Sequence, residues 1–325
     1  MTGAPVLEVL AAGPSTTVQD GGRPGLAHVG VGSSGAADRG ALRRANALVG
    51  NPPGAAGLEV LLGGLALRAL APVAVAVTGA PGPVDVDGRA VGTGAATRLR
   101  PGEVLRLAHA DRGVRRYVAV AGGVQAPAVL GSRSRDGLAG LGPEPVVDGQ
   151  LLAVAHDPNA EERTRDDRLS AGAPVVGGTT PRHGPHDDGA QDDGHRGPDA
   201  FDAYGPDGWV LPVLPGPQAG WFRPGALLAA TLTVSPTSDR TAVRLDGPPV
   251  ERRPAAVGRE LAPAGLVRGA VQVPPDGRPV VFGADHPVTG GYPVVAVVRA
   301  WALDAVGQLR PGDPVRFVVG LHPGR

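Results

Sequence analysis

The stretch Val73-Ala74-Val75-Ala76-Val77 carries the clearest fold signal in the sequence, and it predicts a β-strand. Its β-branched valines recur at every second position, so their side chains point to one face of the strand. Alanine, also apolar, occupies the opposite face. The alternation is therefore typical of a strand in a sheet that is buried on both sides.

Short valine-rich runs of the same kind, separated by turn residues, lie on both sides of this strand and predict a mostly β protein. In the first part of the chain they are Leu7–Leu10, Leu58–Leu62, Val84–Val86, Ala90–Val91, Val104–Leu107 and Tyr117–Ala121. In the last part they are Trp209–Leu214, Leu227–Val234, Ala270–Val273, Val280–Phe282, Val294–Val298 and Val315–Val319.

One helix and one helical turn interrupt the strands. The helix follows a long loop, Ala11–Gly32, and either Ser34 or Asp38 is placed to cap it. It is predicted to end at Gly50-Asn51-Pro52. Leu303–Leu309 is predicted to form a single helical turn.

Composition divides the chain into two halves and a linker. Residues 156–205 are rich in Asp, His, Arg, Gly and Pro, and such a segment buries too little apolar surface to offset its ordering entropy. We therefore predict a first half at 1–155, a flexible linker at 156–205 and a second half at 206–325. His183, His186 and His195 of the linker lie among aspartates, which is compatible with weak metal binding or with a simple solvated segment.

Charge and residue usage exclude several classes of function. The 325 residues carry 31 basic and 31 acidic side chains, so no basic excess predicts a nucleic-acid or membrane surface. The sequence contains no cysteine and no lysine, which excludes thiolate chemistry, Schiff-base catalysis and a covalently bound biotin. No signal peptide and no transmembrane segment are expected, and we predict a cytoplasmic protein. Arginine or backbone N–H groups must hold any bound anion.

Several motifs occur in a fixed order along the chain. The first are Thr16–Gly25, Gly32–Asp38, Ala45–Asn51 and Gly131–Asp136, and the later ones are Leu214–Gln218, Val234–Arg240, Gln272–Pro274 and Thr289–Pro293. In this order they resemble the family of the 5-oxoprolinase C subunit, which is also called allophanate hydrolase subunit 2 or the biotin-dependent carboxyltransferase family.

The resemblance implies a fold and a reaction. The fold is two cyclophilin-like β-barrel subdomains, carboxyltransferase subdomains A and B, with a few short helices. The reaction is the opening of the 5-oxoproline lactam to glutamate, with ATP and Mg²⁺, by a complex of this chain with the 5-oxoprolinase B and A subunits. Phosphorylation of the lactam oxygen makes it a leaving group, so that water attacks the carbon. Such a site needs cations for phosphates, an acid or base for water, and a clamp for the substrate carboxylate.

Four residues are predicted to take part in the chemistry. Asp20 and Arg23 share a glycine-rich loop that lets a ligand approach the backbone, although an internal Asp–Arg pair is the alternative. Asp285, next to His286, is a candidate acid or base, and Tyr292 is a rare aromatic beside two glycines.

Further motif residues are predicted to bind substrate or nucleotide, and no residue is predicted to be a dedicated metal ligand. Each has a structural alternative, such as a helix cap, a rigid turn or a salt bridge. These residues are Gln19, Ser34, Asn46, Arg133, Gln218, Asp239, Arg240, Gln272, Thr289, Gly290 and Gly291.

The chain departs from the family pattern in places. Pro212 stands where an arginine is common, and Pro263-Ala264-Gly265 aligns with a common Ser-Glu-Gly. Two alternative functions therefore stay open. One is the carboxyltransferase component of a urea-carboxylase-like system, which would need a separate biotin carrier. The other is a non-catalytic regulatory partner of a protein similar to the 5-oxoprolinase B subunit.

Overall fold

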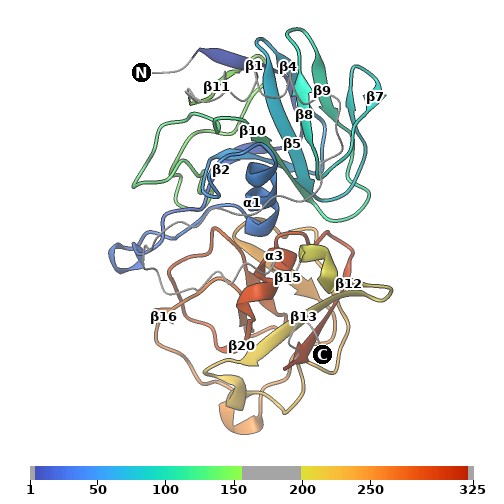
Figure 1. The fold of residues 1–325 in the computed structure, drawn as a ribbon. Helices are drawn as coiled ribbons and strands as arrows, with labels where there is room; N and C mark the ends of the chain where they lie inside the picture. Colours follow the sequence, from blue (N-terminus) through green and yellow to red (C-terminus); the bar gives the residue numbers. More distant parts are fainter. Residues whose placement is uncertain (1–3, 156–198, 321–325) are drawn as a thin grey trace, which may run out of the picture. The chain divides into compact units, whose positions relative to one another are not determined.

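The computed structural model describes residues 4–155 and 199–320, and its elements are labelled in Figure 1. The described residues on both sides of the gap belong to one compact unit. Most of the predicted linker, with His183, His186 and His195, lies outside the described residues. The predicted boundaries at 155 and 206 stay a prediction.

The first half contains a six-stranded antiparallel sheet. Its strands, in spatial order, are β11 (Leu151–Ala153), β1 (Pro5–Ala12), β4 (Leu65–Ala69), β9 (Val104–Leu107), β6 (Val84–Val86) and β7 (Arg89–Ala90). The predicted hairpin joins β6 to β7, with Asp87 at φ 50° and Gly88 at φ 79°. Two consecutive residues with positive φ are what a tight two-residue hairpin turn requires.

A second, five-stranded antiparallel sheet shares the core with the first. Its order is β2 (Thr16–Gln19), β3 (Gly57–Leu61), β10 (Arg115–Val120), β5 (Val73–Gly79) and β8 (Ala96–Leu99). Leu7, Leu67 and Leu105 of the first sheet lie in one buried cluster with Leu58 and Val75 of the second. The alternating valines and alanines thus belong to β5, a strand in the interior of this half.

Helix α1 (Arg39–Leu48) packs against β5 and β10 through a small apolar face. Ala41 and Leu42 of the helix cluster with Ala36 and Tyr117. The Thr78 hydroxyl of β5 donates a 2.7 Å hydrogen bond to the Ala41 carbonyl. These contacts fix the N-terminal end of α1, where several predicted site residues lie.

The second half is a barrel that closes on itself. Its sheet runs β12 (Tyr204–Gly205), β13 (Gly208–Pro215), β20 (Val294–Val298), β17 (Ala270–Gln272), β18 (Val280–Phe282), β15 (Ala242–Asp246), β14 (Leu232–Val234) and β21 (Pro314–Val319). A parallel pairing between β13 and β21 completes the ring. Trp209, Leu211, Phe222 and Phe317 fill its interior.

The remaining elements are short. They are the hairpin β16 (Ala264–Gly265) with β19 (Thr289–Gly290), helix α3 (Leu303–Val306), and the 3₁₀ turns η1 (Ala27–Val29), η2 (Ala200–Ala203), η3 (Ala219–Trp221), η4 (Pro254–Ala256) and η5 (Ala300–Ala302). No helix in 4–155 or 199–320 is long and apolar enough to cross a bilayer.

The predicted fold class is confirmed: the chain is mostly β, with a closed barrel in the second half and a few short helices. Three local predictions need correction. Thr16–Gln19, placed in a loop, forms strand β2 because it pairs with β3. The predicted strand Leu227–Val234 is strand only from Leu232, because turns occupy 224–228. Strands β4, β8, β11 and β15 were not predicted, because their strand character depends on pairing with neighbouring strands.

Candidate functional site

Arg240 is the centre of a buried ion-pair network that joins the two halves. Its Nε and Nη2 atoms donate to both oxygens of Asp285, each at 2.9 Å, in the bidentate geometry that strengthens guanidinium–carboxylate pairs. Its Nη1 donates to Glu59 of β3, and its Nη2 also donates to the Gly35 carbonyl at 2.7 Å. We call Ser34, Glu59, Arg240 and Asp285 the junction cluster.

Ser34 completes the cluster from a strained position. Its side chain is fully buried, and its φ of 48° lies in the left-handed region that non-glycine residues rarely adopt. Its hydroxyl donates to Asp285 Oδ1 at 2.7 Å, and the Gly137 N–H donates to Oδ2 at 3.0 Å. Strain of this kind is often retained at functional sites.

Glu59 is held ionised inside the protein. Burial by itself raises the pKa of the carboxyl group, but Arg240, Arg115 and the Ala37 N–H outweigh that effect and lower it to about 2. Arg115 Nε donates to Glu59 Oε1 at 3.0 Å, and the Tyr117 hydroxyl donates to Oε2 at 2.8 Å. All of these partners act together, so Glu59 is a fixed negative charge at neutral pH.

Asp20 organises a loop rather than pairing with Arg23. Its Oδ1 accepts from the hydroxyls of Ser132 and Ser134, each at 2.6 Å, and from the Gly22 N–H at 2.8 Å. Its Oδ2 accepts from the Arg133 N–H at 2.6 Å. The alternative of an internal Asp20–Arg23 pair is therefore wrong, because the carboxylate clamps the 132–134 segment instead.

Polar atoms around this clamp lack hydrogen-bond partners among the described residues. They are Gln19 Oε1, Arg23 Nη1 and Arg133 Nε, all buried. Arg23 donates to the Ser134 carbonyl through Nη2, and its Nη1 lies 3.8 Å from Asp136. Gln19 donates to the Arg135 carbonyl at 2.9 Å. Buried groups of this kind usually find a partner, so they favour a bound water or ligand here.

The N-terminal end of α1 is already occupied. Asp38, not Ser34, caps the helix by accepting from the Ala41 N–H at 2.7 Å. Asp304 of α3 accepts from the N–H groups of Arg39 and Gly40, each at 2.9 Å. A carboxylate of the second half thus occupies N–H groups that a helix N-terminus can otherwise offer to an anion.

Asp38 has an unusual protonation equilibrium. Burial, and then the nearby charge of Asp304, raise its pKa to about 7, although the Gln308 and Ala41 hydrogen bonds act in the opposite direction. Gln308 Nε2 donates to Asp38 Oδ2 at 2.7 Å, and Gln308 Oε1 accepts from the Val114 and Arg115 N–H groups. Asp38 thus belongs to a second polar link between the halves.

Two predicted residues make only local contacts. Asn46 is buried on α1, where its amide donates to the Ala55 carbonyl at 2.8 Å and its oxygen accepts from Asn51. Asp239 accepts from the N–H groups of Thr241 and Ala242 and does not pair with Arg240. Both arrangements stabilise turns, and neither places the side chain at the junction cluster.

A separate cavity of about 790 Å³ lies in the second half, a volume within the range of small-molecule sites. Gly291 and Tyr292 line it, and Tyr292 is 48% exposed. Gln272 Nε2 donates to the Tyr292 carbonyl at 2.9 Å, and this hydrogen bond links strand β17 to the loop that contains Tyr292. Gln218 accepts from the Val294 N–H at 3.0 Å, and Thr289-Gly290 forms strand β19.

Most of the predicted site residues thus lie in three different parts of the structure. Ser34, Arg240 and Asp285 meet at the junction cluster, and Gln19, Asp20, Arg23 and Arg133 lie in the adjoining clamp. Tyr292 and Gly291 line the cavity, and Gln272 donates a hydrogen bond to the Tyr292 carbonyl. The roles of all these residues in binding or catalysis stay a prediction.

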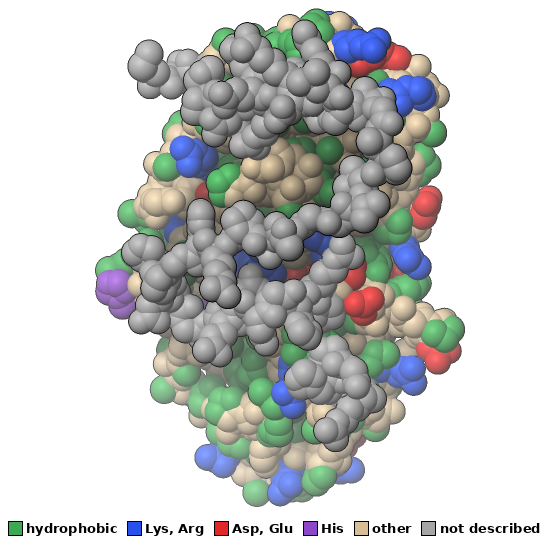
Figure 2. All heavy atoms as spheres, in the orientation of Figure 1, with side chains coloured by type: hydrophobic (Ala, Val, Ile, Leu, Met, Phe, Trp, Pro, Cys, Tyr) green, Lys and Arg blue, Asp and Glu red, His purple; other side chains and the backbone are tan. Residues whose placement is uncertain are grey.

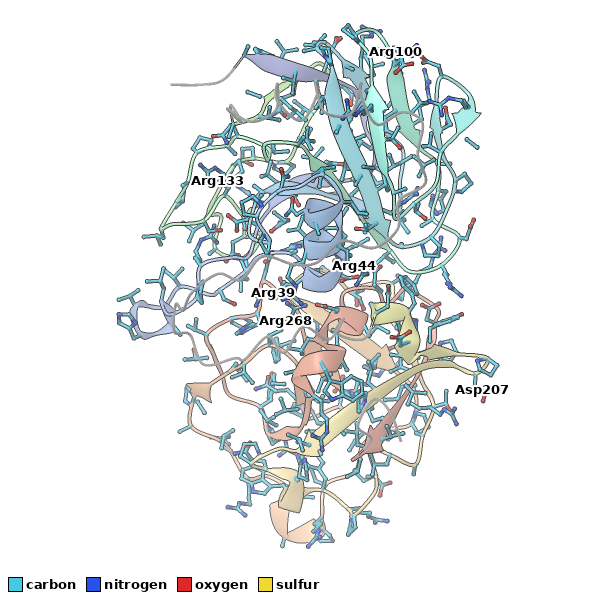
Figure 3. All side chains as sticks on the ribbon, viewed as in Figure 1. Arg39, Arg44, Arg100, Arg133, Asp207 and Arg268 are labelled. Atoms are coloured by element: carbon cyan, nitrogen blue, oxygen red, sulfur yellow. The ribbon has the colours of Figure 1, made fainter. Side chains whose placement is uncertain are left out.

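Sequence reasoning missed Glu59, Arg39 and Arg268. Glu59 had a visible signal, because a lone carboxylate within the apolar run Gly57–Leu61 is costly to bury without a partner. Arg39 and Arg268 gave no comparable signal. Figure 3 labels both, and they lie next to each other near the N-terminal end of α1.

Unpaired guanidinium donors of the described residues suit the phosphate groups of ATP. Arg23 Nη1 and the Nε atoms of Arg39 and Arg268 are buried donors that lack hydrogen-bond partners in the described part of the chain, although Arg23 Nη1 also lies 3.8 Å from Asp136. Guanidinium groups suit phosphate oxygens. The acidic groups nearby, Glu59 and Asp285, have their oxygens engaged by protein donors, so no carboxylate of the cluster is free for Mg²⁺.

Charge on the protein surface is mixed. On the face drawn in Figure 2, basic and acidic side chains are scattered and do not form a field of one sign. The junction cluster, in contrast, holds one guanidinium group and two carboxylates in the interior.

Comparisons with known proteins agree with this architecture. The family described as carboxyltransferase domain, subdomain A and B, matches residues 29–319. The C subunit of 5-oxoprolinase from Escherichia coli (strain K12) is 34% identical over 320 residues, covering 96% of this chain and 91% of that protein.

Solved structures show the same fold. The TTHA0988 crystal structure superposes with a TM-score of 0.74 and 32% identity over 97% of this chain. The K. lactis urea amidolyase superposes with a TM-score of 0.78 and 26% identity over 98% of this chain. The chain spans 55% of the TTHA0988 chain and 19% of the urea amidolyase chain, so both contain further parts.

Proposed function

The chain belongs to the carboxyltransferase domain family of subdomains A and B, and on this premise we propose that it is the C subunit of an ATP-dependent 5-oxoprolinase. The observation that carries the proposal is the likeness to the C subunit of E. coli 5-oxoprolinase, which extends over 91% of that protein. The partners are the A and B subunits, the substrate is the lactam 5-oxoproline, and the complex works in the cytoplasm.

The proposed chemistry overcomes the poor reactivity of a lactam. Transfer of the ATP γ-phosphoryl group to the lactam oxygen forms a C–O–P bond and releases ADP. Water then adds to the same carbon, the C–N bond breaks, and a proton passes to the nitrogen that leaves. A second water releases phosphate, so one ATP and two waters give ADP, phosphate and glutamate. The protein must stabilise negative charge and accept a proton from water.

Asp20 and Asp285 are poorly placed to accept that proton. Every oxygen of these two carboxylates already accepts hydrogen bonds from protein donors. We therefore assign them, within the proposal, the role of positioning residues. Asp285 orients Arg240 and Ser34, and Asp20 orients the clamp.

His286 is the better candidate base. Its Nδ1 lies 2.8 Å from the Pro287 carbonyl, which only accepts, so Nδ1 carries the proton. In the neutral ring Nε2 bears the lone pair, and no hydrogen bond to it is found among the described residues. The ring is only 8% exposed and directly follows Asp285 of the junction cluster. An imidazole with one nitrogen held by a hydrogen bond and the other left free suits proton transfer.

The test is reconstitution. The chain is co-expressed with the A and B subunits from the same genome, the complex is purified, and glutamate release from 5-oxoproline is measured with ATP. We expect ATP-dependent release that needs all three proteins. A stable, folded complex of all three without glutamate release contradicts the proposal.

A second candidate, a carboxyltransferase acting on a urea-like amide, is favoured by the likeness to urea amidolyase. Because this chain has no lysine, the biotin would reside on another protein. The discriminating measurement supplies a biotinylated carrier and a carboxylase and follows transfer of labelled carboxylate. Transfer to urea would support this candidate, whereas glutamate release without a carrier would exclude it.

A further inference from the structure

Arg39 and Arg268 bring two guanidinium groups together from opposite halves of the chain. Arg39 is the first residue of α1, and its Nη2 donates to the Ser34 carbonyl at 3.2 Å. Arg268 donates through Nη2 to the carbonyls of Ala37 and Leu303. The labelled side chains lie side by side in Figure 3. Both therefore border the backbone that also carries Ser34 of the junction cluster.

The two cations share a single carboxylate. Asp304 lies 4.0 Å from Arg268 Nη2, and its oxygens are already committed to the N–H groups of Arg39 and Gly40. The nearby carboxylates Glu59 and Asp285 are engaged by Arg240 and other donors. The positive charges of Arg268, which is 10% exposed, and of the partly buried Arg39 thus have about one negative charge between them, and like charges at short range repel.

Both guanidinium groups also retain unused donors. The Nε atoms of Arg39 and Arg268 are buried and have no hydrogen-bond partner among the described residues. The side chain of Arg268 is only 10% exposed. Burial, and then the charge of Arg39, lower the pKa of Arg268 to about 10, so it stays a cation at neutral pH. A buried cation with an unused donor is costly unless something pairs with it.

We propose that Arg39 and Arg268 together bind an oxyanion, a carboxylate or a phosphate group, between the two halves. An oxyanion supplies the missing negative charge and accepts hydrogen bonds from both guanidinium groups. In a chain without lysine, guanidinium groups are the side-chain cations that can bind such an anion. The natural source of the group rests on the proposed function: either the carboxylate of 5-oxoproline or a phosphate of the nucleotide.

The test uses the purified full chain without its partners. Thermal unfolding and calorimetry are recorded with inorganic phosphate, pyrophosphate and 5-oxoproline, and with sodium chloride at matched ionic strength. We expect saturable binding and a raised Tm with at least one of the three anions, beyond the effect of chloride. Binding of 5-oxoproline alone identifies a carboxylate site, and binding of phosphate or pyrophosphate identifies a phosphate site. Binding of none of them overturns the proposal.

Three variants locate the site. Arg268→Gln and Arg39→Gln are each expected to weaken anion binding about ten- to hundredfold, the usual cost of one charge-assisted hydrogen bond. Arg278→Gln is the matched control, because Arg278 is exposed and pairs with Asp246 at 3.1 Å in the same half. Circular dichroism establishes that each variant is folded, and either site variant suffices if the other does not fold. Equal affinity in all three variants overturns the proposal.

The experiments distinguish a failure of the proposed anion site from a failure of the proposed function. If the isolated chain binds an anion through Arg39 and Arg268 but the complete complex releases no glutamate, the proposed function fails and the anion site stands. If the complex is active but the two variants bind anions as the wild type does, the anion site fails alone.

Discussion

At the residue scale, Arg240 is the side chain on which the junction of the two halves depends. Replacing it with methionine removes the shared partner of Glu59 and Asp285, two carboxylates that are almost completely buried. Removing one member of a buried ion pair costs about 3–5 kcal/mol, because the other charge stays buried. We predict a loss of this size for Arg240→Met in the free energy of unfolding, measured with urea.

Arg278→Met serves as the control for that measurement. Its pair with Asp246 is exposed, with side chains 62% and 43% accessible, and exposed pairs contribute about 0–1 kcal/mol. Comparable losses in the two variants would show that the buried network has no special role.

The pKa values of Asp38 and Glu59 predict how stability depends on pH. Glu59 has a lowered pKa, so its contribution is complete above about pH 4.5 and is lost as the pH falls toward 2. Asp38 has a pKa raised from 3.8 to about 7, so the folded state holds a proton there that the unfolded state releases. Stability should therefore decrease as the pH rises from about 4 to 7, by at most about 1.4 kcal/mol per pH unit.

Asp38→Asn isolates this second effect. Asparagine caps a helix as well as aspartate does but does not titrate. The expected outcome is a flatter dependence of the unfolding free energy on pH between about pH 4 and 7. Parallel curves for the variant and the wild type would show that Asp38 titrates normally.

His286 is tested by activity. We predict that His286→Gln lowers the rate of glutamate release in the complete complex by about 10²–10⁴-fold, the usual contribution of a general base. His28→Gln is the matched control, because His28 also contacts a backbone carbonyl through Nδ1, at 2.9 Å from Gly25, but is exposed in the 3₁₀ turn η1. Equal rates for both variants would remove His286 from the mechanism.

At the element scale, the loop between β2 and α1 depends on glycines with positive φ. Gly22 has φ 87°, and a Cβ atom there would lie 2.4 Å from the Ser33 carbonyl oxygen. Gly25 has φ 86° but open space around it. Both alanine variants carry the strain of the left-handed region, and only Gly22→Ala adds a clash with backbone.

We therefore predict that Gly22→Ala lowers the free energy of unfolding by at least about 1–3 kcal/mol more than Gly25→Ala does, because backbone must move to relieve the clash. Thermal unfolding of the two variants measures the difference. If both variants lose the same free energy of unfolding, the close contact between the Gly22 and Ser33 backbone does not constrain the conformation of this loop.

The sequence predicted elements well where the pattern was regular. Valine alternation located β5, and the cap and stop signals located α1 to within a residue or two. It failed at β2, β4 and β15, whose strand character comes from pairing with neighbours rather than from composition. Pairing is a tertiary effect, and local propensity does not contain it.

At the scale of the whole molecule, the resemblance to the family predicted the fold, which the structure confirms. Its motifs also contain Ser34 and Arg240, and residue chemistry added Asp285; the folded chain brings the three together from positions up to 251 residues apart. The position of Glu59 in the same cluster, and the pairing of Arg39 with Arg268, depend on how the halves meet. No local pattern encodes that arrangement, so these residues had to be found in the structure.

The most direct test of the whole account is an omission experiment on glutamate release. The rate is measured with the A and B subunits alone, with this chain added, and with this chain added but ATP withheld. The account predicts release of glutamate from 5-oxoproline only when this chain and ATP are both present. Equal release by the A and B subunits without this chain, or release without ATP, would contradict it.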